Sequence, residues 1–313
     1  MKDIKFLIQE FYRRTGNTKE KSIIKDIFKN NKELKRSMWV YLVEYSTLPV
    51  YVVRTLGKKY IVKVYNKNID IFDVKKYLKE IVKYEEILKN NNVNISMPLK
   101  INGNYIFETE EYYFLVFDYI KCFSVRERGL YNPKMDLERL VDLLIQSQSI
   151  DKEFDLPFFY NEIKDYKMDE LADMVEKNNI YLSKVKDDLT ICHNDFRPSN
   201  ILWTKKNNIP YLTDFDAVAY AYKYANLIEA AINFSYDNIS INFNAMEKIF
   251  KYYFNKVKDK GDFEMAFYLS LNGKLSWLNH MISINDPATH FLVDLLKYVQ
   301  SCKDKIKEIY LKA

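Results

Sequence analysis

Three polar side chains have the types and the order that transfer of a phosphoryl group requires. Asp195 is followed by Asn200 five residues later, and Asp214 comes fourteen residues after Asn200. A loop carboxylate can accept the proton of a hydroxyl nucleophile, while an amide oxygen and a second carboxylate are hard ligands that suit Mg²⁺. Because phosphoryl transfer depends on positioning and positive charge rather than on covalent catalysis, these three groups match its needs.

Short apolar segments on both sides of these residues predict buried strands that hold them in place. Leu189–Cys192 precedes the loop, and Ile201–Trp203 and Ile209–Thr213 follow it, joined by a predicted hairpin turn at Asn207-Asn208. Kinase catalytic loops have the same Asp-x4-Asn spacing, with a metal-binding Asp on the next strand. The spacing alone also occurs in loops whose Asn and Asp cap turns, so it is the flanking strands that favour phosphoryl transfer.

His193 lies two residues before Asp195 and belongs to the same candidate catalytic group. An imidazole nitrogen can carry a proton during catalysis, or it can make a fixed hydrogen bond. In a loop of this kind we expect His193 to act as a brace, so that its ring holds the loop while Asp195 meets the hydroxyl group.

The segment from His193 to Leu202 resembles the His-Gly-Asp-x4-Asn-Ile-Leu loop of the aminoglycoside phosphotransferase and choline kinase superfamily. Thr213–Ala217 is similar to the Ile-Asp-Trp/Phe-Glu/Asp strand of that family. The superfamily includes antibiotic, choline, ethanolamine, homoserine and sugar kinases, as well as spore-coat-associated kinase-like proteins. The resemblance implies an α+β, two-lobed protein-kinase-like fold, ATP with Mg²⁺ as cofactors, and a small-molecule hydroxyl acceptor.

The chain departs from the family pattern at three positions. Asn194 replaces the usual Gly, Arg197 stands where a His is common, and Asn226 stands where an Asp often precedes Leu. None of these changes removes an acid or a metal ligand of the motif. Asn tolerates the left-handed backbone conformation better than most residues, so we expect the loop to form. The third change bears on the rigidity of the loop rather than on its chemistry.

A strand lysine offers a second test, because kinases hold the ATP phosphates with a Lys that is paired with a helix Glu. Tyr60–Tyr65 predicts a strand in which Lys63 stands between valines. Burying an unpaired ammonium group is costly, so we expect a phosphate-binding role for it, although a solvent-facing residue on an edge strand would have the same pattern. The helix predicted over Ile71–Asn90 offers Glu80 as the first choice of partner and Glu85 as the second.

The loop over the nucleotide phosphates is expected at Ser46 and Thr47, between two predicted strands. The chain has six glycines, and none are spaced as in Gly-x-Gly-x-x-Gly or Gly-x4-Gly-Lys, which excludes a P-loop and a dinucleotide fingerprint. Hydroxyl groups and backbone amides would then bind the phosphates. An ordinary hairpin turn explains the segment equally well.

The adenine-binding hinge is expected at the end of a later strand, over Phe117, Asp118, Tyr119 and Ile120. In a kinase-like fold the backbone at this point joins the two lobes and meets the base. A strand that simply ends in the core would look the same in sequence.

The order of predicted elements divides the chain into two lobes. Residues 1–120 form the nucleotide-binding lobe, a mostly antiparallel sheet with one main helix, and residues 121–313 form a mainly helical catalytic and acceptor-binding lobe. The strands are predicted at Val40–Tyr45, Val50–Thr55, Tyr60–Tyr65, Ile101–Phe107 and Tyr112–Ile120. The later helices are predicted at Leu137–Ser149, Tyr166–Asn178, Asn226–Asn233, Met246–Val257, Phe263–Ile284 and Ala288–Leu311.

Composition limits the possible partners. The 48 Lys and Arg residues exceed the 43 Asp and Glu residues by five, and the basic runs read as solvated helix faces rather than as a nucleic-acid surface. No apolar run is long enough for a targeting segment or a membrane span, and three cysteines without paired spacing indicate reduced thiols. We expect a cytoplasmic protein that binds neither nucleic acid nor membrane, with an oligomeric state that the sequence does not determine.

The identity of the acceptor stays open among three chemical types. An aminoglycoside would require an acidic pocket, to which Asp216, Glu229 and Asp237 could contribute. Choline would require an aromatic cage, for which the candidates are Trp203, Trp277 and the cluster Tyr220, Tyr222 and Tyr224. Homoserine would require a base for its carboxylate and an acid for its amine, and no diagnostic pair stands out in the sequence. GTP in place of ATP, and a catalytically weak kinase-like binding protein of the spore-coat type, are the further alternatives.

Overall fold

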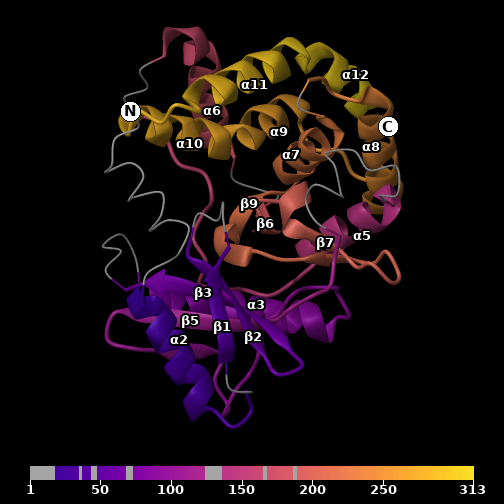
Figure 1. Cartoon of the computed structure of the whole chain (residues 1–313). Coiled ribbons are helices and arrows are strands. Elements are labelled where there is room, and N and C mark those ends of the chain that lie inside the picture. The colour runs from indigo at the N-terminus through magenta and orange to yellow at the C-terminus, as the bar shows by residue number, and fades with distance from the viewer. Residues whose placement is uncertain are drawn as a thin grey trace. The chain divides into compact units, whose positions relative to one another are not determined.

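The computed structural model describes residues 18–34, 37–43, 48–67, 73–123, 136–164, 168–185, 189–237 and 239–313. Contacts within the chain divide it into two compact units (Figure 1). The first unit comprises Met1–Lys89 and Ile95–Lys121, and the second comprises Asn90–Asn94 and Cys122–Ala313.

The first unit is built on one five-stranded antiparallel sheet with the order β1-β2-β3-β5-β4. Its strands are β1 (Ser37–Leu42), β2 (Val50–Thr55), β3 (Lys59–Asn66), β4 (Ile106–Glu108) and β5 (Tyr112–Asp118). Among the described residues of this unit, two helices belong with the sheet, α2 (Thr18–Asn30) and α3 (Val74–Asn90).

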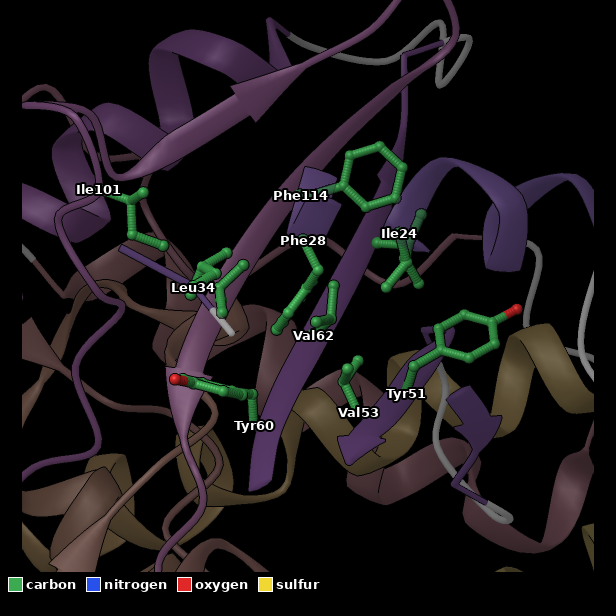
Figure 2. Close-up of a cluster of buried hydrophobic side chains, with 11 residues drawn as sticks. Ile24, Phe28, Leu34, Tyr51, Val53, Tyr60, Val62, Ile101 and Phe114 are labelled. Atoms are coloured by element: carbon green, nitrogen blue, oxygen red, sulfur yellow. The ribbon is translucent and has the colours of Figure 1, made fainter. Parts of the chain in front are cut away.

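Each face of the sheet carries its own apolar core, because successive side chains of a strand point to opposite faces. On one face, Ile24 and Phe28 of α2 pack with Val62 and Phe114 (Figure 2). The opposite face carries a second cluster, in which residues of β3 and β5 pack with residues of α3: Tyr65, Tyr113, Leu115, Phe117, Val74 and Leu78. The two helices therefore cover opposite faces of one sheet.

The second unit is mostly helical and holds two short antiparallel strand pairs. β6 (Leu189–Cys192) pairs with β9 (Ala219–Tyr222), and β7 (Ile201–Trp203) pairs with β8 (Pro210–Leu212). The α-helices are α5 (Leu137–Gln148), α6 (Ala172–Lys184), α7 (Lys223–Ser235), α8 (Phe243–Val257), α9 (Phe263–Ser270), α10 (Asn272–Ser283), α11 (Thr289–Ser301) and α12 (Lys303–Lys312). The predicted α+β class, with an antiparallel sheet first and a mainly helical part second, is confirmed. In the described ranges no helix has both the length and the apolar character needed to cross a membrane.

Several predicted element boundaries were wrong, and each has a local reason. The strand expected over Ile101–Phe107 is only β4, because the chain turns tightly at Asn102 and Gly103, which both have positive φ angles. The helix expected over Phe263–Ile284 is divided into α9 and α10 just before Asn272-Gly273, where glycine weakens a helix.

Two further helix predictions need the same correction. The helix expected over Ala288–Leu311 is divided at Cys302 into α11 and α12, and its backbone there makes tighter bonds of the 3₁₀ type. The helix expected over Tyr166–Asn178 begins later, as α6 at Ala172, after a short 3₁₀ turn at Asp169–Leu171.

Candidate active site

The loop that follows β6 carries the first candidate residues, and buried contacts hold it. The His193 side chain is fully buried, and its Nε2 atom lies 3.0 Å from the carbonyl oxygen of Thr213. Its ring also contacts the rings of Phe196 and Phe215 edge-on. His193 thus connects the loop to the segment just before Asp214, which is the geometry of a brace.

Asn200 holds the carboxyl group of Asp195 in position. The Nδ2 group of Asn200 donates to Asp195 Oδ2 at 2.7 Å and to the Asp195 carbonyl oxygen at 2.9 Å. The second carboxylate oxygen, Oδ1, forms an ion pair with Arg197 Nε at 2.9 Å. Because the amide nitrogen of Asn200 points at Asp195, its Oδ1 atom points elsewhere, and Ser199 Oγ donates to it at 3.3 Å.

Main-chain bonding brings Asp214 beside Asn200. The backbone N–H of Thr213 donates to the carbonyl oxygen of Asn200 at 3.0 Å, so the residue that follows Thr213 lies next to Asn200. Asp214 itself has a φ angle of 70° and a ψ angle of 63°, a left-handed conformation that is uncommon for a residue with a side chain. Such strain is kept only where the surrounding structure determines it, and it concentrates at functional sites.

Asn200 and Asp214 each carry hard oxygen atoms of the kind that Mg²⁺ bound to a nucleotide takes as ligands. Mg²⁺ is usually held by one or two protein carboxylates together with water and substrate phosphates, and not by a cage of protein ligands. Over the part of the chain that the structure describes, no group of three or more His, Cys, Asp or Glu side chains could hold a metal ion by itself. A site of two oxygens completed by phosphates is consistent with both facts.

Asn194 binds the loop to the segment that follows Asp214. It has a φ angle of 56° and a buried side chain. Its Nδ2 group lies within hydrogen-bonding distance of three carbonyl oxygens, those of Cys192 (3.0 Å), Ala217 (3.0 Å) and Ala219 (3.3 Å). The glycine usual in the family at this position could adopt the same backbone conformation, but it could not make these bonds.

The carboxyl group of Asp195 sits among opposing influences. The pKa of Asp195 is raised to about 6, chiefly by burial; the charges of Glu229 and Asp214 contribute to the rise, and the Arg197 guanidinium opposes it. The side chain keeps 30% of its surface exposed. The group is thus buried enough for neighbouring charges to matter, and open enough to be reached.

Helix α7 lies along this loop and presents polar residues to it. Asn226 Oδ1 accepts from Gln148 Nε2 at 3.0 Å, and the same Gln148 nitrogen lies 3.7 Å from Cys192 Sγ in β6. Asn233 Nδ2 donates to the carbonyl oxygen of Phe196 at 3.3 Å. Neither Gln148 nor Asn233 was predicted from the sequence. For Asn233, the available signal was the spacing of polar residues along the mostly apolar helix α7.

One further residue that the sequence analysis missed is Lys274, in α10. Its Nζ atom forms an ion pair with Glu229 Oε1 of α7 at 2.7 Å, and the two side chains keep 19% and 14% of their surface exposed. No sequence pattern connects these residues, because they lie 45 positions apart.

In the first unit, Lys63 lies in the sheet with 8% of its surface exposed. It stands opposite Leu115 of β5 and alternates with Val62 and Val64, so it shares the sheet face that α3 covers. A lysine buried to this degree in the sheet is not a solvent-facing residue of an edge strand.

The two candidate glutamates of α3 have different surroundings. Glu85 is buried, with 2% exposure, and it continues the stripe formed by Leu78, Ile81 and Val82. Glu80 keeps 18% of its side chain exposed and forms an ion pair with Lys83 at 3.3 Å.

The expected hinge follows β5. Phe117 is buried in the face that α3 covers, whereas Asp118 forms an exposed ion pair with Lys58. The backbone N–H of Tyr119 donates to the carbonyl oxygen of Lys59, and Ile120 is partly exposed. The candidate phosphate loop, Ser46 and Thr47, lies outside the described residues.

Comparison with known families decides the class of protein. The model of a family described as "Phosphotransferase enzyme family" matches residues 44–225, which is more than half of the chain. The chain belongs to this phosphotransferase enzyme family. The expectations of a family member and of a phosphoryl-transferring enzyme are confirmed. A comparison with curated protein sequences finds no match.

Solved structures share the fold at low sequence identity. The choline kinase LicA from Streptococcus pneumoniae is 16% identical with a TM-score of 0.66, over 91% of this chain and 98% of that one. A microcompartment-associated aminopropanol kinase is 12% identical with a TM-score of 0.66, over 93% and 97%. The amicoumacin kinase hAmiN, solved with AMP-PNP, Ca²⁺ and its ligand Ami, is 11% identical with a TM-score of 0.63, over 97% and 94%. At these identities the likeness shows the fold of the phosphotransferase, and nothing about its acceptor.

Proposed function

We propose that this phosphotransferase transfers the γ-phosphate of ATP to a hydroxyl group of a small molecule. One observation carries the proposal. The side chain of Asn200 holds the Asp195 carboxyl group, while its backbone carbonyl accepts from Thr213, next to Asp214. One amide residue therefore connects a candidate base with a candidate metal ligand, which is the arrangement that in-line phosphoryl transfer needs.

Asp195 is the proposed base and orienting group. A hydroxyl group approaching its exposed side would donate to Oδ1, in competition with Arg197, while Asn200 keeps Oδ2 in place. This contact aligns the acceptor oxygen for attack and takes up its proton as the new bond forms. His193 would hold the loop through Thr213 without handling the proton.

Asn200 and Asp214 are the proposed ligands of Mg²⁺. When bound, the ion neutralises charge on the phosphate oxygens during transfer. The protein contributes two oxygen donors whose spacing is set by the Thr213 to Asn200 hydrogen bond. The Nδ2 group of Asn200 is occupied by Asp195, so its Oδ1 atom is the one presented to a cation.

Lys63 is the proposed ligand of the nucleotide phosphates, with Glu85 as its partner. Burial of both side chains on the α3 side of the sheet supports this pairing, and the ion pair of Glu80 with Lys83 argues against the first choice made from the sequence. Paired with a buried carboxylate, a buried lysine would be held in place until phosphate arrives. The first lobe, residues 1–120, would then bind the nucleotide, and residues 121–313 would provide catalysis and the acceptor site.

The hinge and the phosphate loop complete the nucleotide proposal. Because the Tyr119 N–H is engaged with Lys59, the adenine ring would meet a different backbone group in the Phe117–Ile120 segment. Ser46 and Thr47 would cover the phosphates. The use of AMP-PNP in the amicoumacin kinase structure supports an adenine nucleotide.

The test combines nucleotide binding with a transfer assay. ATP with Mg²⁺ should raise the melting temperature of the protein, and labelled phosphate should pass from ATP to at least one compound in a panel of aminoglycosides, choline, amino alcohols, hydroxy amino acids and sugars. Stabilisation by ATP without transfer to any acceptor would indicate a kinase-like binding protein instead. A protein that neither binds ATP nor transfers phosphate would refute the proposal.

A further inference from the structure

We propose that Glu229 and Lys274 bind the charged groups of the acceptor, and that the acceptor is a hydroxyl compound carrying both an ammonium and an anionic group. Glu229 would take the ammonium group and Lys274 the anionic group, while Asp195 meets the hydroxyl group. This inference rests on the proposed function and names the acceptor class for the same site.

The position of Glu229 follows from the contacts on either side of it in α7. Asn226 bonds to Gln148, which reaches Cys192 at the end of β6, and Asn233 bonds to the backbone of Phe196. Glu229 lies three residues after the first contact and four before the second, so it shares their helix face. It therefore lies alongside the stretch between Cys192 and Phe196, which contains Asp195.

The base of Lys274 is held firmly by the start of α10. Asn272 Nδ2 donates to the carbonyl oxygen of Asn161 at 2.9 Å and to Asn178 Oδ1 at 2.7 Å. At Gly273, an added Cβ atom would lie 3.2 Å from Cζ of Phe159, so the backbone next to Lys274 runs close against that ring. A fixed backbone leaves the long Lys274 side chain as the part that can adjust to a ligand.

The charge balance of the site argues for a dipolar acceptor. Asp195 is paired with Arg197, and Glu229 is paired with Lys274. A polycation would have to displace both Arg197 and Lys274 from their carboxylate partners. A dipolar molecule can instead bind between Glu229 and Lys274, with its ammonium group on Glu229 and its anionic group on Lys274. Both side chains keep some exposure, so a ligand can reach them without opening the core. The new ion pairs with the ligand would offset the desolvation of Glu229 and Lys274.

The experiment compares three acceptors of similar length: homoserine, aminopropanol without the carboxylate, and hydroxybutyrate without the amine. The wild-type enzyme should prefer homoserine in kcat/KM by roughly 10- to 100-fold, the share of one charge-assisted hydrogen bond. Lys274→Met should remove the preference over aminopropanol and keep that over hydroxybutyrate. Glu229→Gln should do the reverse.

These opposite changes in acceptor preference distinguish binding of the acceptor's charges from a purely structural ion pair. If the pair only joined α7 to α10, both variants would lower kcat/KM for every acceptor alike, and the inference would fail. Lys303→Met is the matched control, because Lys303 forms an ion pair with Glu264 at similar burial between α9 and α12. It should lower stability and leave the acceptor preference unchanged.

Failure of this inference is distinguishable from failure of the proposed function. Transfer to choline or to an aminoglycoside, with little to homoserine, would keep the kinase and overturn the dipolar acceptor. ATP-dependent stabilisation without transfer to any dipolar compound would overturn it as well. Loss of ATP binding in the wild-type protein would instead refute the kinase itself.

Discussion

The loop of the second unit that carries Asp195 and the lysine region of the first unit hold their polar groups in different ways. In the loop, His193, Asn194 and Asn200 are fixed mostly by bonds to main-chain carbonyl groups of the loop and of the strands that follow it. Around Lys63, burial comes from a sheet face and from the separate helix α3. Irregular backbone is thus held by side-chain amides, whereas regular elements position their polar groups through packing.

This difference predicts how each region responds to substitution. An amide that bonds to several carbonyl groups holds a geometry, so its loss should affect turnover more than folding. A carboxylate buried between helix and sheet belongs to a packed core, so its loss should affect both stability and nucleotide binding.

The largest effect is expected at Asp195. Asp195→Asn should lower turnover by roughly 10²–10⁴-fold, the typical contribution of a general base, while ATP binding is kept. Steady-state kinetics and calorimetry with ATP measure the two quantities. Asp173→Asn is the control, because Asp173 is an exposed acid of α6. Unchanged turnover in the Asp195 variant would mean that Asp195 is not the general base.

The next effect concerns the metal. Asp214→Ala should abolish the part of nucleotide affinity that depends on Mg²⁺, because one of the two proposed oxygen ligands is lost. Calorimetric titration of ATP with and without Mg²⁺ measures that part directly. If the variant showed the same Mg²⁺ dependence as the wild type, Asp214 would not be a ligand.

A pair of variants separates the two glutamates of α3. Glu85→Gln should lower the free energy of unfolding by about 1–3 kcal/mol, the cost of disturbing a buried polar group, and should raise KM for ATP. Glu80→Gln should change stability by less than about 1 kcal/mol, because its ion pair is made with a half-exposed lysine. Urea unfolding and ATP kinetics on both variants decide between them. The reverse ranking would restore Glu80 as the partner of Lys63.

The smallest effect is expected at Asn194. Asn194→Gly keeps the left-handed backbone available but removes contacts to three carbonyl groups. Turnover should fall roughly tenfold, which corresponds to about 1.4 kcal/mol, and more Mg²⁺ should be needed for activation. Asn92→Gly is the matched control, since Asn92 is exposed and has a φ angle of 60°. Equal effects of the two variants would mean that the Asn194 amide does not position the site.

The catalytic loop could be predicted from the sequence because its geometry is local. The β7–β8 hairpin, its turn near Asn208, and the closeness of Asn200 to Asp195 all involve residues only a few positions apart, whereas β6 pairs with the more distant β9. The contact of His193 with Thr213 also follows from two short strands that adjoin the loop. Spacing and residue type carry this information because a short chain segment has few ways to fold back on itself.

Other features could not be predicted for the same reason. Distance along the helix favours Glu80 in the sequence, whereas the burial of Glu85 depends on the sheet that the helix meets. At the division between α9 and α10, the Asn272 side chain accepts from the backbone N–H of Asn161 and donates to Asn178 Oδ1, and both partners are distant in the sequence.

The sequence by itself determined the class of this phosphotransferase, through Asp195, Asn200 and Asp214 and the strands between them. Only the tertiary structure joined Glu229 to Lys274 and placed Glu85 in the buried stripe of α3. The physical reason is range: main-chain bonding within a loop is set by neighbouring residues, whereas the pairing of charges on separate helices is set by how those helices pack.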